Sequence, residues 1–167
     1  GTLCIDSLLG GTNLSYKLCL VRDAVCIAHS FLDHDKCGIE SAQKAELDGL
    51  LMPVDVTHTV CDGMKESEIE DLYDESLYTN MLQNKYGVST ASPKFAGKGK
   101  WSDRLRETFM HQGKIWSDQV EAKVKADVGE LVEKNPGVAL NAHKRSSFDA
   151  LCESLKAKLK AISNSKK

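Results

Sequence analysis

Two aspartates separated by one residue are the feature of this sequence best suited to chemistry. Asp33 and Asp35 follow the apolar run AVCIAHSFL, which begins at Ala24, and Gly38 then opens a helix-like run. The β-branched and aromatic residues of the apolar run predict a buried strand. Residues i and i+2 of a strand share a face, so the two carboxylates can project together. A divalent cation is the usual way to relieve the repulsion between two such charges.

The same pattern also fits a strand-end turn in which both aspartates cap the next helix or lie in water. The spacing of Asp33 and Asp35 does not by itself decide between the metal site and the helix cap. The residues that lie near them in the fold have to decide.

A second group of carboxylates follows the third predicted strand, in the run ESEIED that begins at Glu66. If the sheet is parallel, both groups leave it at the same edge and can meet there. Carboxylates from two loops could hold two divalent metals, which activate water and stabilise the leaving oxygen in phosphodiester hydrolysis. An all-oxygen site favours Mg²⁺ or Mn²⁺. The alternative for this acidic run is a helix N-terminus, where carboxylates complement the helix dipole.

The pattern of apolar residues predicts an α/β fold in the first part of the chain. Strand-type runs cover residues 2–9, 24–33 and 54–61, and helical periodicity covers residues 12–22 and 38–50. Strands that alternate with helices predict a parallel sheet.

The rest of the chain reads as helical. A capping box, Ser67 with Glu70, predicts a helix start, and amphipathic helices are expected over 101–113, 116–133 and 147–162. We therefore expect an α/β core over residues 1–75, a helical extension over 76–162 and a flexible tail over 163–167.

Composition narrows the class of protein. The chain has 167 residues, a net charge of −2 and 41% hydrophobic residues, so it can bury a core and is not a basic nucleic-acid-coating protein as a whole. Six cysteines without CxxC pairs argue against a zinc site or disulfide framework. No signal peptide or membrane span is visible, so we expect a cytoplasmic protein. The chain begins with Gly on a strand-like run, and we expect it to be a piece of a longer protein.

Four segments in order, LLGGTNL, FLDHDKCG, ESEIEDLYD and KWSDRL, resemble the nuclease half of the overcoming-lysogenization-defect (OLD) family. Members of this family are ATPase-coupled nucleases with a Toprim catalytic domain, which has a Rossmann-like parallel sheet. The resemblance, over about residues 8–155, implies a divalent-metal-dependent DNA endonuclease. It implies metal-binding roles for Asp33 and Asp35, which match the LDxDxxG motif, and for Glu68, Glu70 and Asp71. By the same resemblance Lys125 is the catalytic lysine, although a solvated helix lysine explains it equally well.

The sequence departs from the Toprim pattern at one point. Toprim domains carry a glutamate on their first strand, and this chain has no such strand. By the resemblance, that strand and an ATPase domain lie upstream in the parent protein. We therefore expect this chain alone to bind Mg²⁺ or Mn²⁺ weakly and to cut DNA poorly or not at all. The expected partners are DNA and the ATPase domain, with no membrane; a homodimer is left open.

Two other functions fit the same residues. A haloacid-dehalogenase-like phosphatase also places a DxD at a strand end, and a truncated module that only dimerises or regulates an ATPase needs no site at all.

Trp101 and Trp116 are expected to be core anchors, although Trp101 lies beside lysines and arginines that could contact nucleic acid. The lysine-rich loop 94–100 could steer a phosphate backbone. His29, on the apolar strand, is expected to be a core histidine with hydrogen-bonded nitrogens.

Overall fold

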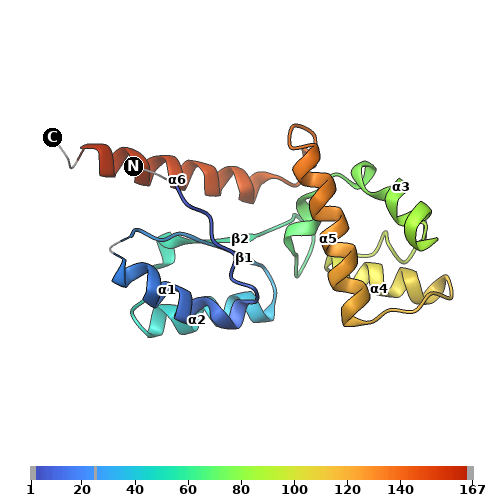
Figure 1. Ribbon diagram of the computed structural model, residues 1–167, viewed down its shortest axis with the longest axis horizontal. Helices are drawn as coiled ribbons and strands as arrows, with labels where there is room; N and C mark the ends of the chain where they lie inside the picture. The colour runs from blue at the N-terminus through green and yellow to red at the C-terminus, as the bar shows by residue number, and fades with distance from the viewer. Residues whose placement is uncertain (1–2, 25, 165–167) are drawn as a thin grey trace. The chain divides into compact units, whose positions relative to one another are not determined.

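The computed structural model describes residues 3–24 and 26–164 of the chain (Figure 1). These residues form two compact units, one of Gly1–Thr59 with Ser146–Lys167 and one of Val60–Arg145. Each unit has its own hydrophobic core. Within the described residues, no helix has the length and apolar character needed to cross a bilayer.

The first unit is an α/β layer structure around two parallel strands. Strands β1 (Ser30–Asp33) and β2 (Val56–Thr59) pair in register from Ser30 opposite Val56 to Asp33 opposite Thr59. Helix α6 (Ser146–Asn164) covers one face of the strands, and α1 (Leu14–Asp23) and α2 (Lys36–Leu47) lie on the other (Figure 1). Short 3-10 turns, η1 (Gly11–Asn13) and η2 (Pro53–Asp55), precede α1 and β2. The predicted α/β class with a parallel sheet is confirmed.

Helical periodicity correctly identified the core-facing residues of this unit. Leu14 and Leu18 recur at helical spacing on α1, as do Ala42 and Ala45 on α2, and all four are buried in the core; Val21 and Ile39, at the same spacing, are only half-buried. Leu32 of β1 packs with the four buried residues. A 3.6-residue repeat therefore sufficed to locate both helices and the face that each one buries.

The first predicted strand, over residues 2–9, is wrong for the described residues 3–9, which form no ladder. Strand-type side chains are not enough, because a strand needs a partner for its backbone groups and cover for its apolar face. Here Ile5 is 89% exposed and Leu3 51% exposed. The second predicted strand is also shorter than expected, since pairing begins at Ser30; its residue Val25 lies outside the described residues, as does Thr2 of the first.

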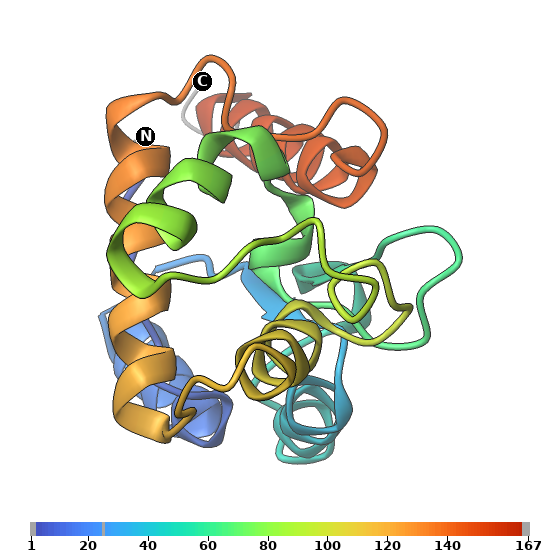
Figure 2. The same cartoon turned by 90° about the vertical axis from the view of Figure 1, so that its right-hand side faces the viewer.

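The second unit consists of helices and turns. Helix α5 (Asp118–Lys134) runs along one side of the unit and α4 (Trp101–His111) crosses it (Figures 1 and 2). The shorter elements are the 3-10 turns η3 (Ile69–Leu72) and η4 (Glu75–Leu77), the helical turn α3 (Thr79–Met81) and the π-helical turn η5 (Leu82–Tyr86). The two long helices agree with the predicted amphipathic segments.

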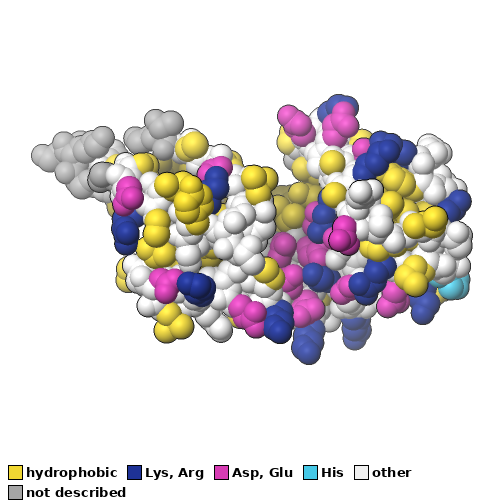
Figure 3. Space-filling view, turned by 60° about the horizontal axis from the view of Figure 1, so that its bottom comes forward, with side chains coloured by type: hydrophobic (Ala, Val, Ile, Leu, Met, Phe, Trp, Pro, Cys, Tyr) yellow, Lys and Arg dark blue, Asp and Glu magenta, His cyan; other side chains and the backbone are white. Residues whose placement is uncertain are grey.

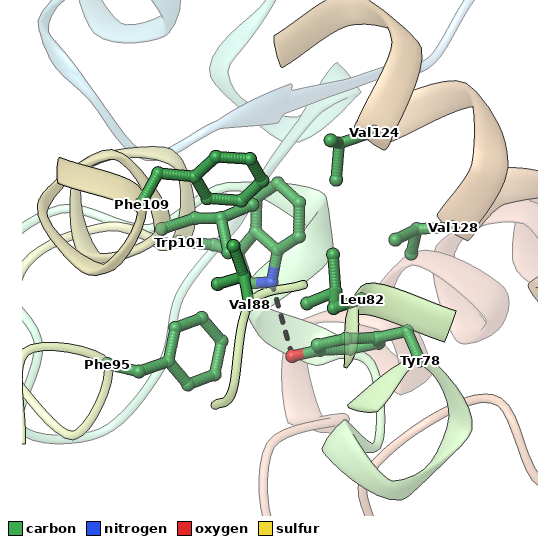
Figure 4. Packing of buried hydrophobic residues seen from close by; sticks show 9 residues of the cluster. Tyr78, Leu82, Val88, Phe95, Trp101, Phe109, Val124 and Val128 are labelled. Atoms are coloured by element: carbon green, nitrogen blue, oxygen red, sulfur yellow. Dashed lines mark hydrogen bonds between the residues drawn. The ribbon is translucent and has the colours of Figure 1, made fainter. Parts of the chain in front are cut away.

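Trp101 is the centre of the second core. It is fully buried, and its indole N–H donates a hydrogen bond to the Tyr78 hydroxyl at 3.2 Å (Figure 4). Phe95, Phe109 and Val124 pack in the same cluster. Trp101 is therefore a core anchor, as expected, and its ring is not available to stack on a nucleic-acid base.

The helix predicted to start at Ser67 is only a single 3-10 turn, and its capping box lies one residue later than predicted. Glu68 is the N-cap and Asp71 is its reciprocal partner. The chain then leaves helical geometry because Tyr73 forms an antiparallel bridge with Leu140. The backbone bond from Asn141 N–H to the Leu72 carbonyl, 2.8 Å, holds the bridge in place. A long-range contact has thus overridden the local helical pattern.

Helix α6 is part of the first compact unit. From the sequence we expected it to be part of a helical extension. Polar contacts fix it to the sheet. Lys158 Nζ donates to the Ala28 carbonyl at 3.1 Å and to Asp55. The ring of His29 lies between the hydroxyls of Thr57, 2.8 Å from Nε2, and Ser154, 3.2 Å from Nδ1. Both ring nitrogens of His29 are therefore hydrogen-bonded, as expected, but the residue is half-buried beside the core rather than inside it.

The environment of His29 makes the stability of the first unit depend on pH. Burial lowers the pKa of His29 below its ordinary value of 6.5, the Lys158 ammonium lowers it further, and Asp55 opposes them. Between the lowered pKa and 6.5 the unfolded chain binds more protons than the folded one. The free energy of unfolding should therefore fall as the pH drops below 6.5 and then level off. Urea unfolding across this range should lose that slope in His29→Asn but keep it in His111→Asn, whose ring is exposed. An unchanged slope in His29→Asn would contradict this assignment.

Candidate functional site

The predicted aspartates lie at the carboxyl edge of the two-stranded sheet. Asp33 is the last residue of β1, and Asp35 is the N-cap of α2. One carboxylate oxygen of Asp35, Oδ1, accepts the backbone N–H of Gly38 at 2.9 Å. Asp35 thus caps the helix, as the structural alternative predicted. This bond also holds the carboxylate in a fixed orientation at the edge where ligands of such sheets bind.

Gly38 allows the helix to begin directly against the end of the strand. A Cβ atom at this position would lie 2.1 Å from the Asp33 carbonyl oxygen, a separation that no real Cβ atom adopts. The reason for glycine is close approach, since its φ is not positive. Asp33, Asp35 and Gly38 therefore belong to one strand-to-helix turn. The glycine in this turn allows the helix to start close to the end of the strand.

His58 and Thr59 of β2 complete the edge, and the sequence did not single them out. The backbone N–H of His34 donates to Thr59 Oγ1 at 3.1 Å. His58 Nδ1 lies 3.2 Å from the Asp33 carbonyl oxygen, so it must carry the proton in this contact. The rings of His34 and His58 meet edge to face, with centroids 6.0 Å apart. Only the register of the two strands could have identified these neighbours.

A pocket of about 560 Å³ opens beside Asp35, lined by the start of α1 with the turn before it and by α2 as far as Lys44. Its volume lies in the range of small-molecule sites. Residues with hydroxyl, thiol, ammonium and carboxylate groups line it, together with Gly11. The lining residues are Gly11, Thr12, Leu14, Ser15, Asp35, Lys36, Cys37, Glu40, Ser41 and Lys44.

The acidic segment, which we define as Glu66–Asp71, lies in the second unit and is largely buried. Glu68 is 2% exposed and Asp71 is 1% exposed. Asp71 Oδ2 accepts the backbone N–H of Glu68 at 2.9 Å and that of Trp101 at 3.1 Å. Asp71 therefore caps its own 3-10 turn and also receives a first-turn amide of α4, where a negative charge is favoured by the helix dipole.

Basic side chains compensate both buried charges. Arg104 Nη2 lies 2.5 Å from Asp71 Oδ1. Glu68 Oε1 accepts the Ser102 hydroxyl at 2.5 Å and lies 3.0 Å from Lys100 Nζ. Lys125 Nζ lies 3.1 Å from the other oxygen, Glu68 Oε2. Buried carboxylates require such partners, because an unpaired charge in the interior is strongly destabilising.

These contacts determine the charge states of Glu68 and Lys125. Burial raises the pKa of Glu68, but the Ser102 hydroxyl and the ammonium groups of Lys125 and Lys100 outweigh it, so the pKa is lowered overall. Burial lowers the pKa of Lys125, but the carboxylates of Glu70 and Glu68 raise it above its ordinary value. Both groups are therefore charged at neutral pH, and Lys125 is a cation rather than a proton acceptor.

The predicted site residues thus fall into two groups in different units. Asp33 and Asp35 are together at the sheet edge, and Glu68, Glu70, Asp71 and Lys125 are together in the second unit. That these two groups of residues meet in one metal site stays a prediction. Among residues 3–24 and 26–164, no set of three or more His, Cys, Asp and Glu side chains is arranged to hold a metal ion.

The basic residues of the second unit are mixed with acidic ones. On the face shown in Figure 3, Lys and Arg side chains alternate with Asp and Glu and form no single basic patch. In the loop 94–100, Lys94 lies 3.9 Å from Glu107, and Lys100 pairs with Glu68. Lys100 therefore has a structural partner.

Comparison with protein-family models, with curated proteins and with solved structures gave no match to this chain.

Gly38→Ala should lower the free energy of unfolding of the first unit by roughly 1–3 kcal/mol, the usual cost of forcing an extra carbon into a packed site. The reason is the 2.1 Å approach of a Cβ to backbone rather than to a flexible side chain. Gly129→Ala is the matched control, because a Cβ there meets nothing within 4 Å. In the interior of α5 it should be neutral or stabilising by up to ~1 kcal/mol. Equal losses of stability for Gly38→Ala and Gly129→Ala in urea denaturation would contradict the close packing of Gly38 against the Asp33 carbonyl.

Asp71→Asn should lower the free energy of unfolding by roughly 3 kcal/mol, because it leaves the buried Arg104 guanidinium without its counter-charge. Glu107→Gln is the control on the same helix, α4, because its pair with Lys94 is exposed and should contribute less than ~1 kcal/mol. Urea denaturation measures both variants. If Asp71→Asn is as stable as Glu107→Gln, the buried pair is not what anchors α4.

Proposed function

We propose that this chain is the catalytic part of a divalent-metal-dependent DNA endonuclease of the Toprim type found in the OLD family. The observation that carries the proposal is the position of Asp33 and Asp35 at the carboxyl edge of two parallel strands. The family resemblance supplies the reaction, and the close contact of Gly38 with the Asp33 carbonyl accounts for the glycine of the LDxDxxG motif.

The carboxylates of Asp33 and Asp35 suit Mg²⁺ or Mn²⁺. Mg²⁺ is commonly bound through only one or two carboxylates, together with waters and substrate phosphates, so the pair needs no third protein ligand. A metal bound here would activate water and stabilise the leaving oxygen in phosphodiester hydrolysis.

The surrounding residues hold the Asp35 carboxylate and the backbone of Asp33 in place. The Gly38 N–H fixes the carboxylate of Asp35, and the His58 ring fixes the carbonyl of Asp33. This restraint supports a catalytic role, because misplacement of a reacting group by about 1 Å can cost roughly 100-fold in rate.

The pocket beside Asp35 supports a nucleotide substrate. Its volume of about 560 Å³ can take a nucleotide unit. Lys36 and Lys44 at its rim are paired with exposed carboxylates, at 3.8 Å to Glu40 and 2.6 Å to Asp48. Exposed pairs of this kind are weak, so a phosphate backbone can compete for the lysines.

The second group of residues extends the proposal. We propose that Glu68, Glu70 and Asp71 contribute to metal binding and that Lys125 offsets negative charge at the phosphate. The raised pKa of Lys125 supports an electrostatic role over that of a general base.

The test is nicking of supercoiled plasmid with Mn²⁺. The chain should nick slowly, and Asp33→Asn should reduce the rate at least ~100-fold, since loss of outer-shell partners alone costs 10–100-fold. Asp23→Asn, an exposed aspartate at the end of α1, should leave the rate unchanged.

A small aryl phosphate with Mg²⁺ is the parallel substrate. Plasmid nicking that persists in Asp33→Asn contradicts the proposed site. Aryl phosphate hydrolysis that depends on Asp33, in the absence of nicking, would show a phosphatase instead.

A further inference from the structure

The peptide group between Asp33 and His34 is bound at both of its polar atoms by side chains of β2. Its carbonyl oxygen lies 3.2 Å from His58 Nδ1, and its N–H donates to Thr59 Oγ1 at 3.1 Å. His58 and Thr59 are the last two residues of β2, and Thr59 lies opposite Asp33 in the register. The end of one strand thus holds the backbone that follows the other.

Two neighbouring side chains can bind one peptide group because of strand geometry. Successive residues of a strand place their side chains on opposite faces, and the C=O and N–H of a trans peptide point in opposite directions. Because the peptide group is planar, binding both polar atoms restrains ψ of Asp33 and φ of His34. These angles are among the backbone torsions that separate Asp33 from Asp35, so they help to set the direction of one carboxylate relative to the other.

Thr59 is the more deeply buried of the two β2 residues. It is 1% exposed, whereas His58 is half-buried. Water therefore cannot readily take the place of the Thr59 hydroxyl, and loss of that hydroxyl would leave the His34 N–H without this acceptor. Asp35 is held separately, through its bond from the Gly38 N–H.

We infer that Thr59, together with His58, positions Asp33 and Asp35 for binding a divalent cation by fixing the peptide group between them. Thr59 acts through the His34 N–H, so it is a positioning residue rather than a metal ligand. This inference rests on the proposed metal-dependent function and deepens it, because it assigns a role at the sheet edge to residues of β2.

The first measurement is hydrogen exchange of the His34 amide in the whole chain, followed by nuclear magnetic resonance. The amide of Ala45, a fully buried residue of α2, is the reference for global unfolding. Thr59→Val should make the His34 amide exchange roughly 5-fold faster relative to Ala45, in line with the usual net strength of one hydrogen bond. Thr57→Val is the matched control, since its hydroxyl contacts His29 instead. An unchanged ratio in Thr59→Val overturns the inference.

The second measurement is Mn²⁺ affinity, from the electron paramagnetic resonance signal of the free ion. Thr59→Val should weaken binding roughly 10–100-fold, the usual effect of removing a partner of a metal ligand. Thr59→Ser keeps the hydroxyl and should bind Mn²⁺ as the unaltered chain does, and so should Thr57→Val. A role in packing alone predicts the opposite order, because valine fills the space of threonine and serine does not.

The affinities also separate this inference from the proposed function. If Asp33→Asn does not weaken Mn²⁺ binding, or if the unaltered chain binds none, the proposed metal site fails and the inference fails with it. If Asp33→Asn weakens binding but Thr59→Val binds as tightly as the unaltered chain, the inference alone fails.

Substitutions at the half-buried His58 decide the question if Thr59→Val fails to fold. His58→Phe removes the ring N–H that contacts the Asp33 carbonyl, so it should also weaken Mn²⁺ binding. His58→Asn supplies a side-chain N–H donor in its place and should bind more tightly than His58→Phe. Equal Mn²⁺ affinities of these two variants overturn the inference.

Discussion

Two buried negative charges constrain the second unit. Asp71 and Glu68 are almost completely removed from solvent, so the chain must surround them with donors. It does so with the first turn of α4, through the Trp101 amide, the Ser102 hydroxyl and Arg104. The start of α4, and with it the position of the Trp101 ring in the core, is therefore fixed by a polar interaction rather than by apolar packing alone. Lys125 extends the same network to α5.

In the first unit, the corresponding constraint is steric. The glycine at position 38 lets α2 start on the Asp33 carbonyl, and Asp35 closes the turn by accepting the Gly38 N–H. The same turn thus fixes the carboxylate of Asp35 and brings Gly38 against the backbone of Asp33. A cap and a candidate metal ligand are thus compatible roles for Asp35, because a carboxylate has two oxygens and about four lone-pair positions.

The local pattern of apolar residues was enough to predict the positions of the long helices. The periodicity of α1, α2, α4, α5 and α6 located these five helices to within a few residues, because each carries apolar residues at helical spacing. It failed where a distant partner decides the conformation. Residues 3–9 have strand-type side chains but no ladder, and residues 72–74 leave helical geometry because residues 139–141 pair with them.

The same limit applies to the candidate site. The spacing of Asp33, Asp35 and Gly38 is readable from the sequence because it is local. The contacts of Asp33 with His58 and of Asp71 with Arg104 join residues 25 and 33 positions apart. Acidic residues crowded after a strand predict a metal site and a buried ion-pair network equally well, and only the positions of the basic partners separate the two.

The most direct test of the account is where a divalent cation binds. Mn²⁺ broadens the nuclear magnetic resonance signals of amides close to it, so a titration of the isotope-labelled chain maps the site without requiring turnover. The account predicts broadening of the amides of residues 33–38 and of Thr59 at low Mn²⁺, and its loss in Asp33→Asn/Asp35→Asn. Broadening that spares these amides, or that persists there in the double variant, would contradict the claim that Asp33 and Asp35 form the metal-binding edge.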